Sequence, residues 1–140
     1  IKFNDLRIKY FEVDHKPVPF AYGFSFFNNK KKLTISGDTR PCESLMVNAQ
    51  NADVLLHEVF IEYEMKKTSK LRTKKTIHNV KEYHTPSNLV GKVAKLSNCK
   101  KLVLTHFVPT KFNISKLKQT VRKDFGSEPI IGEDLLTIKI

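Results

Sequence analysis

The feature of this sequence that most restricts its fold is a change in hydrophobic pattern near residue 41. Before it, residues 6–13, 20–27 and 32–36 are rich in β-forming side chains, and a polar turn at residues 28–31 separates the last two runs. After it, short apolar runs alternate with segments that have helical spacing. The pattern predicts a β-meander followed by alternating strands and helices, and therefore an α/β domain with a mixed sheet.

The second half is expected to contain three helices. The first covers residues 43–50, the second begins with Thr85 as N-cap and Pro86 as its first residue, and the third covers residues 114–125. The apolar stripe of the second helix is Leu89, Val93 and Leu96. The expected strands cover residues 52–56, 101–105, 129–131 and 135–140. Residues 61–83 give no clear pattern.

Composition limits the partners and the compartment. The 140 residues are enough for one domain, and 25 basic against 14 acidic residues give a net charge of +11. This charge favours an anionic partner, which is nucleic acid, a phosphate ester or an acidic membrane. The apolar runs are too short to span a bilayer, so we expect no membrane insertion. Cys42 and Cys99 form no disulfide framework, which favours a reducing, cytoplasmic location.

One segment concentrates positive charge. Six basic residues lie within ten positions with no acidic residue among them: Lys66, Lys67, Lys70, Arg72, Lys74 and Lys75. They are candidates for contacts with the phosphates of a substrate. The alternative is a solvated loop without a binding role.

Side chains that can bind metal follow four apolar runs. His15, Asp38, the His57–Glu58 pair and His106 each come at or just after the end of such a run. Because layered α/β proteins collect ligands at the carboxyl ends of their strands, this placement predicts a site. Its nitrogen and oxygen donors suit zinc, manganese or iron. Taken singly, each residue also has a structural explanation: Asp38 could close a turn, and His57 could donate to a backbone carbonyl.

His84 stands directly before the expected start of the second helix. A histidine in this place, oriented by a carboxylate such as Glu58, could donate a proton to a leaving group. His78 is expected to be an ordinary surface residue. The alternative for His84 is a flanking residue without a chemical role.

These residues occur in an order that resembles the metallo-β-lactamase superfamily, and within it the branch of RNase Z and arylsulfatase-like hydrolases. The resemblance rests on segments 13–15, 22–23, 36–39, 52–58, 83–85, 104–106 and 132–136. It implies an αββα sandwich and a site with two divalent ions, zinc or else manganese or iron. His15, Asp38 and His106 resemble metal ligands, and His84 with Glu58 resembles the pair that assists departure of the leaving group. His57 resembles a residue that supports the ligands from behind.

Two departures from the family pattern shape the hypothesis. The H-x-H-x-D-H motif is absent, so residues 1–140 resemble the C-terminal half of the sandwich, with helices on the outer face of its sheet. We therefore expect a homodimer or association with the N-terminal half. The long arm that many bacterial tRNA-processing members carry between the positions of Gly23 and Asp38 is also absent. The resemblance implies a phosphodiester hydrolase acting on RNA in tRNA 3′-end processing. The alternatives are an arylsulfatase-like or small cyclic phosphodiester hydrolase, and a non-catalytic nucleic-acid-binding module.

Overall fold

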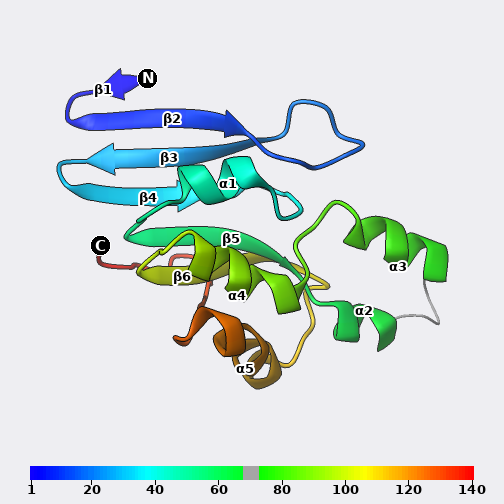
Figure 1. Cartoon of the computed structure of the whole chain (residues 1–140). Coiled ribbons are helices and arrows are strands. Elements are labelled where there is room, and N and C mark those ends of the chain that lie inside the picture. Colours follow the sequence, from blue (N-terminus) through cyan, green and yellow to red (C-terminus); the bar gives the residue numbers. More distant parts are fainter. Residues whose placement is uncertain (68–72) are drawn as a thin grey trace.

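The computed structural model describes residues 1–67 and 73–140 and contains one mixed sheet (Figure 1). The seven strands in this part of the chain are β1 (Lys2–Phe3), β2 (Leu6–Glu12), β3 (Tyr22–Asn28), β4 (Lys31–Ile35), β5 (Val54–Phe60), β6 (Lys101–Val108) and β7 (Ile130–Ile131). The helices are α1 (Glu43–Asn48), α2 (Glu62–Lys67), α3 (Lys74–Lys81), α4 (Ser87–Leu96) and α5 (Ile114–Phe125). None of these helices is long and apolar enough to cross a membrane.

The strands lie across the sheet in their order along the chain. Strands β1 to β4 are antiparallel neighbours, and β4 to β7 are parallel neighbours. Parallel pairing requires a crossover between successive strands, and helices provide it: α1 before β5, α2 to α4 before β6, and α5 before β7. The expected meander followed by an α/β layer is therefore confirmed, and the carboxyl ends of β4, β5 and β6 lie at one edge.

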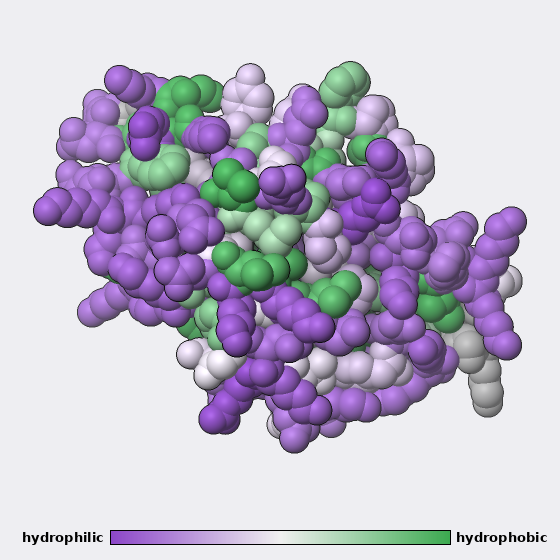
Figure 2. Space-filling view, in the orientation of Figure 1, coloured by the Kyte–Doolittle hydropathy of each residue, from purple (hydrophilic) through white to green (hydrophobic). Residues whose placement is uncertain are grey.

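Helices α1, α4 and α5 cover one face of the sheet (Figure 1). Leu45 of α1, Val90 of α4 and Leu117 of α5 pack with Leu55 and Leu104 of the sheet in one apolar core, and all five are fully buried. The outer surfaces of these helices are mostly hydrophilic, as Figure 2 shows. This core fixes β5 and β6, the two strands that carry most of the candidate site.

The opposite face of the sheet is apolar but largely uncovered. Strand register places Tyr10 beside Phe24 on this face, and their side chains are 63% and 40% exposed. Further along the sheet, residues 132–140 run over Leu56 and Val103 and enclose a cavity of about 330 Å³. An apolar sheet face of this kind is the surface that a second layer covers in a layered α/β protein.

Several local expectations were wrong. Pro86, not Thr85, occupies the N-cap of α4, because the Thr85 side chain instead donates to the Thr39 carbonyl oxygen at 2.7 Å. Of the expected stripe of α4, Val93 is buried, but Leu96 is 66% exposed, because the helix turns Val90 and Ala94 toward the core.

Two further regions, residues 135–140 and residues 61–83, also differ from expectation. Residues 135–140 form no strand, because they lie across the open face of the sheet without pairing. Helices α2 and α3 occupy most of the described part of residues 61–83, for which no clear pattern was expected. Ile77 of α3 packs with Met65 of α2 and Phe60 of β5, so this helical pair has a small core of its own.

Candidate metal centre

Asp38 reaches the edge of the sheet through a turn that requires glycine. It follows β4 by way of Gly37, which has φ +63°. A Cβ atom on Gly37 would lie 2.4 Å from the Tyr22 carbonyl oxygen, so no larger residue fits there without displacement of β3. The Ser36 hydroxyl donates to the Gly37 carbonyl at 2.6 Å and accepts the Glu58 N–H at 3.2 Å, which joins this turn to β5.

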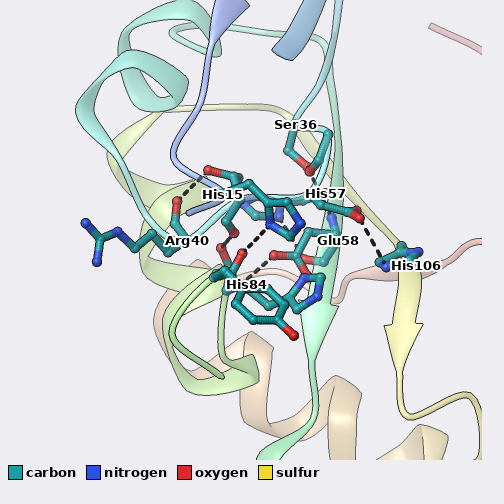
Figure 3. A network of polar contacts seen from close by, with 12 residues as sticks. His15, Ser36, Arg40, His57, Glu58, His84 and His106 are labelled. Carbon is teal, nitrogen blue, oxygen red and sulfur yellow. Dashed lines mark hydrogen bonds and ion pairs between the residues drawn. The ribbon is translucent and has the colours of Figure 1, made fainter. Parts of the chain in front are cut away.

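His106 projects from an irregular position in β6. Glu58 pairs with Thr105 and Val59 pairs with Phe107, so His106 has no partner in the ladder and forms a β-bulge. Its φ is +42°, in the left-handed region that residues other than glycine seldom adopt. Bulges turn side chains out of the regular alternation, and this one brings the imidazole close to Asp38. Figure 3 shows His106 together with His84 and Glu58.

Three side chains offer donor atoms that all lie within 4.8 Å of one another: those of Asp38, His84 and His106. Within this group, His106 Nε2 lies 3.4 Å from Asp38 Oδ2. The His84 side chain is 7% exposed, whereas those of Asp38 and His106 are 40% and 52% exposed. The cluster therefore has one buried member and an open side that faces solvent.

His15 lies beside this cluster but outside the group of three donors. Its ring centroid is 5.2 Å from that of His84 and 5.1 Å from that of Tyr83. The Tyr83 carbonyl oxygen lies 2.7 Å from His15 Nδ1, so Nδ1 carries the proton and donates to it. This bond leaves Nε2 of His15 as the nitrogen available to a metal ion.

Glu58 lies behind His84, as the sequence analysis expected. Its carboxylate is 1% exposed, and one oxygen, Oε2, is 3.3 Å from His84 Nδ1. That approach lacks hydrogen-bond geometry, and neither atom has a hydrogen-bond partner among the described residues. The other oxygen, Oε1, accepts the Thr85 N–H at 2.5 Å. Glu58 therefore holds the segment that carries His84.

His57 is fully buried on the other side of β5. Its Nδ1 lies 2.8 Å from the Glu58 carbonyl oxygen and donates to it, which is the structural alternative that the sequence offered for His57. Nε2 has no partner in the described part of the chain. Burial lowers the pKa of His57, which keeps its ring neutral.

A buried threonine joins the loops that carry the candidate ligands. The Thr39 hydroxyl accepts the Asp14 N–H at 3.1 Å, and the Thr39 carbonyl oxygen accepts the Thr85 hydroxyl at 2.7 Å. Nearby, Arg40 donates from Nε and Nη2 to Asp14 Oδ2 at 2.8 and 2.7 Å. The sequence analysis missed these contacts. Asp14 and Arg40 directly flank the segments with His15 and Asp38, but no local pattern pairs them.

The basic segment is less positive than its sequence suggests. Lys66 pairs with Glu62 at 2.9 Å, and Lys67 pairs with Glu64 at 2.7 Å. Lys74 and Lys75 begin α3, are exposed and form no ion pair among the described residues, while Lys70 and Arg72 lie outside them. His78 is an exposed residue of α3, as expected. The structure does not bring the four described lysines of this segment into the cluster around Asp38.

The donor set fits a divalent metal ion in its chemistry. Imidazole nitrogens and a carboxylate oxygen are ligands that zinc, manganese and iron accept, and three of them converge here. His15 adds a fourth donor next to the cluster. Four donors are too few to fill the coordination of two ions.

Comparison with solved structures defines the class of protein. The chain aligns over 95% of its length with 48% of the metallo-beta-lactamase fold protein YhfI from Bacillus subtilis, with a TM-score of 0.72 and 19% identity. It aligns over its full length with 45% of the short form of human tRNase Z, with a TM-score of 0.62 and 24% identity. The chain therefore has the metallo-β-lactamase fold. No protein-family model matches it.

Comparison with curated protein sequences shows which proteins of this fold the chain is similar to. Ribonuclease Z of Mycobacterium tuberculosis is 26% identical over 139 residues, which are 98% of this chain and 50% of that protein. Ribonuclease Z of Latilactobacillus sakei is 36% identical over 87 residues, which are 60% of this chain and 25% of that protein. These comparisons support a ribonuclease Z-like relationship for a chain with the metallo-β-lactamase fold. The chain spans about half the length of the curated mycobacterial relatives that it matches.

Proposed function

We propose that this chain forms the C-terminal part of a metal-dependent hydrolase that cleaves phosphodiester bonds in RNA, with the 3′ end of tRNA precursors as substrate. The observation that carries the proposal is the convergence of Asp38, His84 and His106 at the carboxyl edge of the sheet, with Glu58 directly behind His84. Similarity to proteins named ribonuclease Z supports the choice of RNA.

Within this proposal, His15, Asp38 and His106 hold two divalent ions, zinc in the first instance, with further ligands from residues upstream of this chain. When bound, such ions polarise the phosphodiester and activate water for attack. Asp38 carries two carboxylate oxygens and can contact both ions. The Tyr83 carbonyl fixes the ring of His15, so that Nε2 is presented for coordination.

His84 is the proposed proton donor to the leaving oxygen. Because its Nδ1 faces Glu58, Nε2 is the nitrogen left for the site, and proton transfer takes place there. Glu58 orients the ring and holds the backbone of the next residue, Thr85. His57 supports this arrangement from within the core through its bond to the Glu58 carbonyl.

The uncovered face of the sheet supports the assignment of residues 1–140 to one half of a sandwich. Leu33, Leu56 and Val103 lie at or near this face, and residues 132–140 lie over part of it. We propose that an upstream N-terminal half covers it in the whole protein. Expressed without that half, the chain would bury the same face by forming a homodimer.

The basic residues of the segment 66–75 are proposed to contact RNA phosphates, with the greatest contribution from Lys74 and Lys75. These two lysines stand at the start of α3, where the helix dipole also favours anions. Lys66 and Lys67 would first have to exchange their carboxylate partners for phosphate.

The test measures metal content and cleavage together. The chain, with and without the residues encoded upstream, is analysed by plasma mass spectrometry and incubated with a labelled tRNA precursor that carries a 3′ trailer. We expect metal and cleavage with the upstream residues present. His106→Ala should lose both, whereas His84→Ala should keep the metal and lose about 10²- to 10⁴-fold in rate.

The exposed His78 supplies the matched control, because His78→Ala removes an imidazole outside the cluster and should change neither quantity. Full metal content and full cleavage in His106→Ala would contradict the proposal. Loss of metal in His84→Ala would instead make His84 a ligand, as its place in the donor group permits.

A second candidate function is hydrolysis of a small sulfate or cyclic phosphate ester. It is favoured by the β3–β4 connection, where Asn28 pairs with Lys31 and only two residues form the turn. One solved structure of similar fold, with a TM-score of 0.65 and 12% identity over the full chain and 46% of that protein, is titled a diphosphatase from the PhnP family. Turnover of small chromogenic esters without cleavage of the tRNA precursor would support this candidate. RNA binding that persists in EDTA without any hydrolysis would support a non-catalytic module.

A further inference from the structure

A cluster of cations lies at the end of the sheet away from the metal-binding residues. Strand register aligns Arg7 of β2, Phe27 of β3 and Lys32 of β4 in one row across three strands. Lys9 follows Arg7 two positions along β2, so its side chain lies on the same face. This face also carries Phe11, which packs into the core with Leu45 of α1, so the row lies on the helix side of the sheet.

The cations gather around one aromatic ring. The Arg7 guanidinium carbon is 4.3 Å from the centroid of the Phe27 ring, and the Lys32 ammonium nitrogen is 5.6 Å from it. Lys32 Nζ also donates to the Gln50 carbonyl at 2.7 Å, which holds the side chain against the surface. Burial, together with the charge of Lys9, lowers the pKa of Lys32. The contacts with Phe27 and Gln50 therefore hold Arg7 and Lys32 in place on this surface.

No carboxylate in residues 1–67 and 73–140 forms an ion pair with Arg7, Lys9 or Lys32. The nearby Asp53 is engaged elsewhere: one oxygen pairs with the Lys100 ammonium at 2.8 Å, and the other accepts the Lys32 backbone N–H at 2.8 Å. Positive charges held close together repel one another unless an anion lies between them. Figure 2 shows hydrophilic side chains gathered over this end of the molecule, where β3 turns into β4.

We propose that Arg7, Lys9, Phe27 and Lys32 form a surface that binds the sugar–phosphate backbone of RNA. The cations are presented on a flat sheet with side chains about 6.7 Å apart along β2, a spacing suited to successive charges of an extended polyanion. The aromatic ring lies beneath the cations and does not project as an anchor that could enter a lipid bilayer. These features favour a nucleic acid over an anionic membrane.

This inference rests on the proposed function, because the bound RNA would be the molecule that reaches the metal-binding cluster. Lys32 and Asp38 are six positions apart in the sequence, which corresponds to at most about 20 Å of chain. A nucleic-acid helix advances about 3.4 Å per nucleotide, so about six nucleotides would span the two places. The surface would hold the body of a substrate while its end lies at the cluster.

The test measures RNA affinity separately from hydrolysis. Binding of a fluorescein-labelled tRNA precursor is followed by polarisation in EDTA, at salt concentrations between about 50 and 200 mM. We expect the triple variant Arg7→Gln, Lys9→Gln and Lys32→Gln to bind at least about tenfold more weakly, and its salt-dependence slope to fall by about 2 to 3. Phe27→Leu should weaken binding by a smaller factor.

The matched control removes the same charge from the outer surfaces of α4 and α5. Lys92, Lys95 and Lys123 are exposed there, and their triple change to Gln should leave affinity within about twofold of wild type. Equal weakening by both triple variants would overturn the proposal, because net charge alone would then explain binding. Thermal unfolding of each variant shows whether it remains folded.

Two further outcomes separate the possible failures. If vesicles of phosphatidylcholine and phosphatidylserine bind the chain and only this binding is lost in the first triple variant, the surface contacts membranes and the inference is wrong. If RNA binding in EDTA depends on the surface but no metal-loaded protein cleaves RNA, the inference stands and the proposed function fails. His106→Ala should leave binding in EDTA unchanged.

Discussion

The ion pair between Asp14 and Arg40 joins the two loops that carry His15 and Asp38, so its removal should loosen the candidate metal centre. Both contacts of the guanidinium reach the same oxygen, Asp14 Oδ2, at 2.8 and 2.7 Å. The backbones of the two loops are also joined, since the Arg40 N–H donates to the Asp14 carbonyl oxygen at 2.9 Å. Arg40→Met and Asp14→Asn remove charge and leave this backbone bond in place.

The exposure of the pair limits its magnitude. Hydrogen bonds between charged groups contribute about 1.5–3 kcal/mol when protected, and fully exposed ion pairs contribute about 0.2–1 kcal/mol. The two side chains are 43% and 24% exposed, so solvent screening places the coupling near the lower range, at about 1 kcal/mol. If the same coupling acts on the metal centre, each single variant should weaken metal binding by at most about fivefold.

A double-mutant cycle measures the coupling. The wild type, the two single variants and the double variant are unfolded with urea at pH 7, and zinc affinity is measured by competition with a chelator. The exposed Lys118–Glu128 pair of 2.8 Å serves as the control, because it lies on α5 and its terminal loop and should affect stability alone.

The pH dependence provides a second measurement. Although partial burial raises the pKa of Asp14, the hydrogen bond and charge of Arg40 outweigh it and hold the pKa below its ordinary value of 3.8. The stabilisation is therefore complete above that value and is lost as the pH falls through the lowered pKa. A coupling energy that is unchanged in acid, or zero at pH 7, would refute this account of the pair.

Three further tests each examine one feature of the fold. Gly37→Ala should lower the free energy of unfolding by about 3 kcal/mol, because at φ +63° the new Cβ would meet a carbonyl oxygen of β3. Gly126→Ala has φ +87° but open space around the new Cβ, so it should lower the free energy of unfolding by about 1 kcal/mol. Urea unfolding of the two variants measures the difference. Asp53→Asn should cost about 1–2 kcal/mol at neutral pH, because the hydrogen bond from Lys100 lowers the pKa of Asp53 below its ordinary value of 3.8, and the difference from wild type should disappear as the pH falls through the lowered pKa. Burial raises the pKa of Cys99 to about 12, so this thiol should react with iodoacetamide only after unfolding, as mass spectrometry of the labelled peptides will show.

The sequence alone was enough to predict most of the strands and the edge of the sheet near which Asp38, Glu58 and His106 lie, because these depend on local patterns. An apolar run of β-forming residues predicts a strand, and a polar residue that ends such a run lies toward an edge of the sheet. The placement of Asp38 just beyond β4 followed in this way, whereas Glu58 and His106 lie inside β5 and β6, which extend further than the expected strands 52–56 and 101–105. The order of these motifs also indicated the superfamily, which the comparisons then confirmed.

Only the tertiary structure decided how the residues meet, because contacts between distant segments leave no periodic trace. The direction of His106 depends on a bulge, which arises from the register of β6 against β5. The Thr85 hydroxyl does not cap α4, because it donates instead to the buried carbonyl oxygen of Thr39. Residues 135–140 have the composition of a strand but lie unpaired over the open face of the sheet. The same holds for the cations around Phe27, which three separate strands bring into one row.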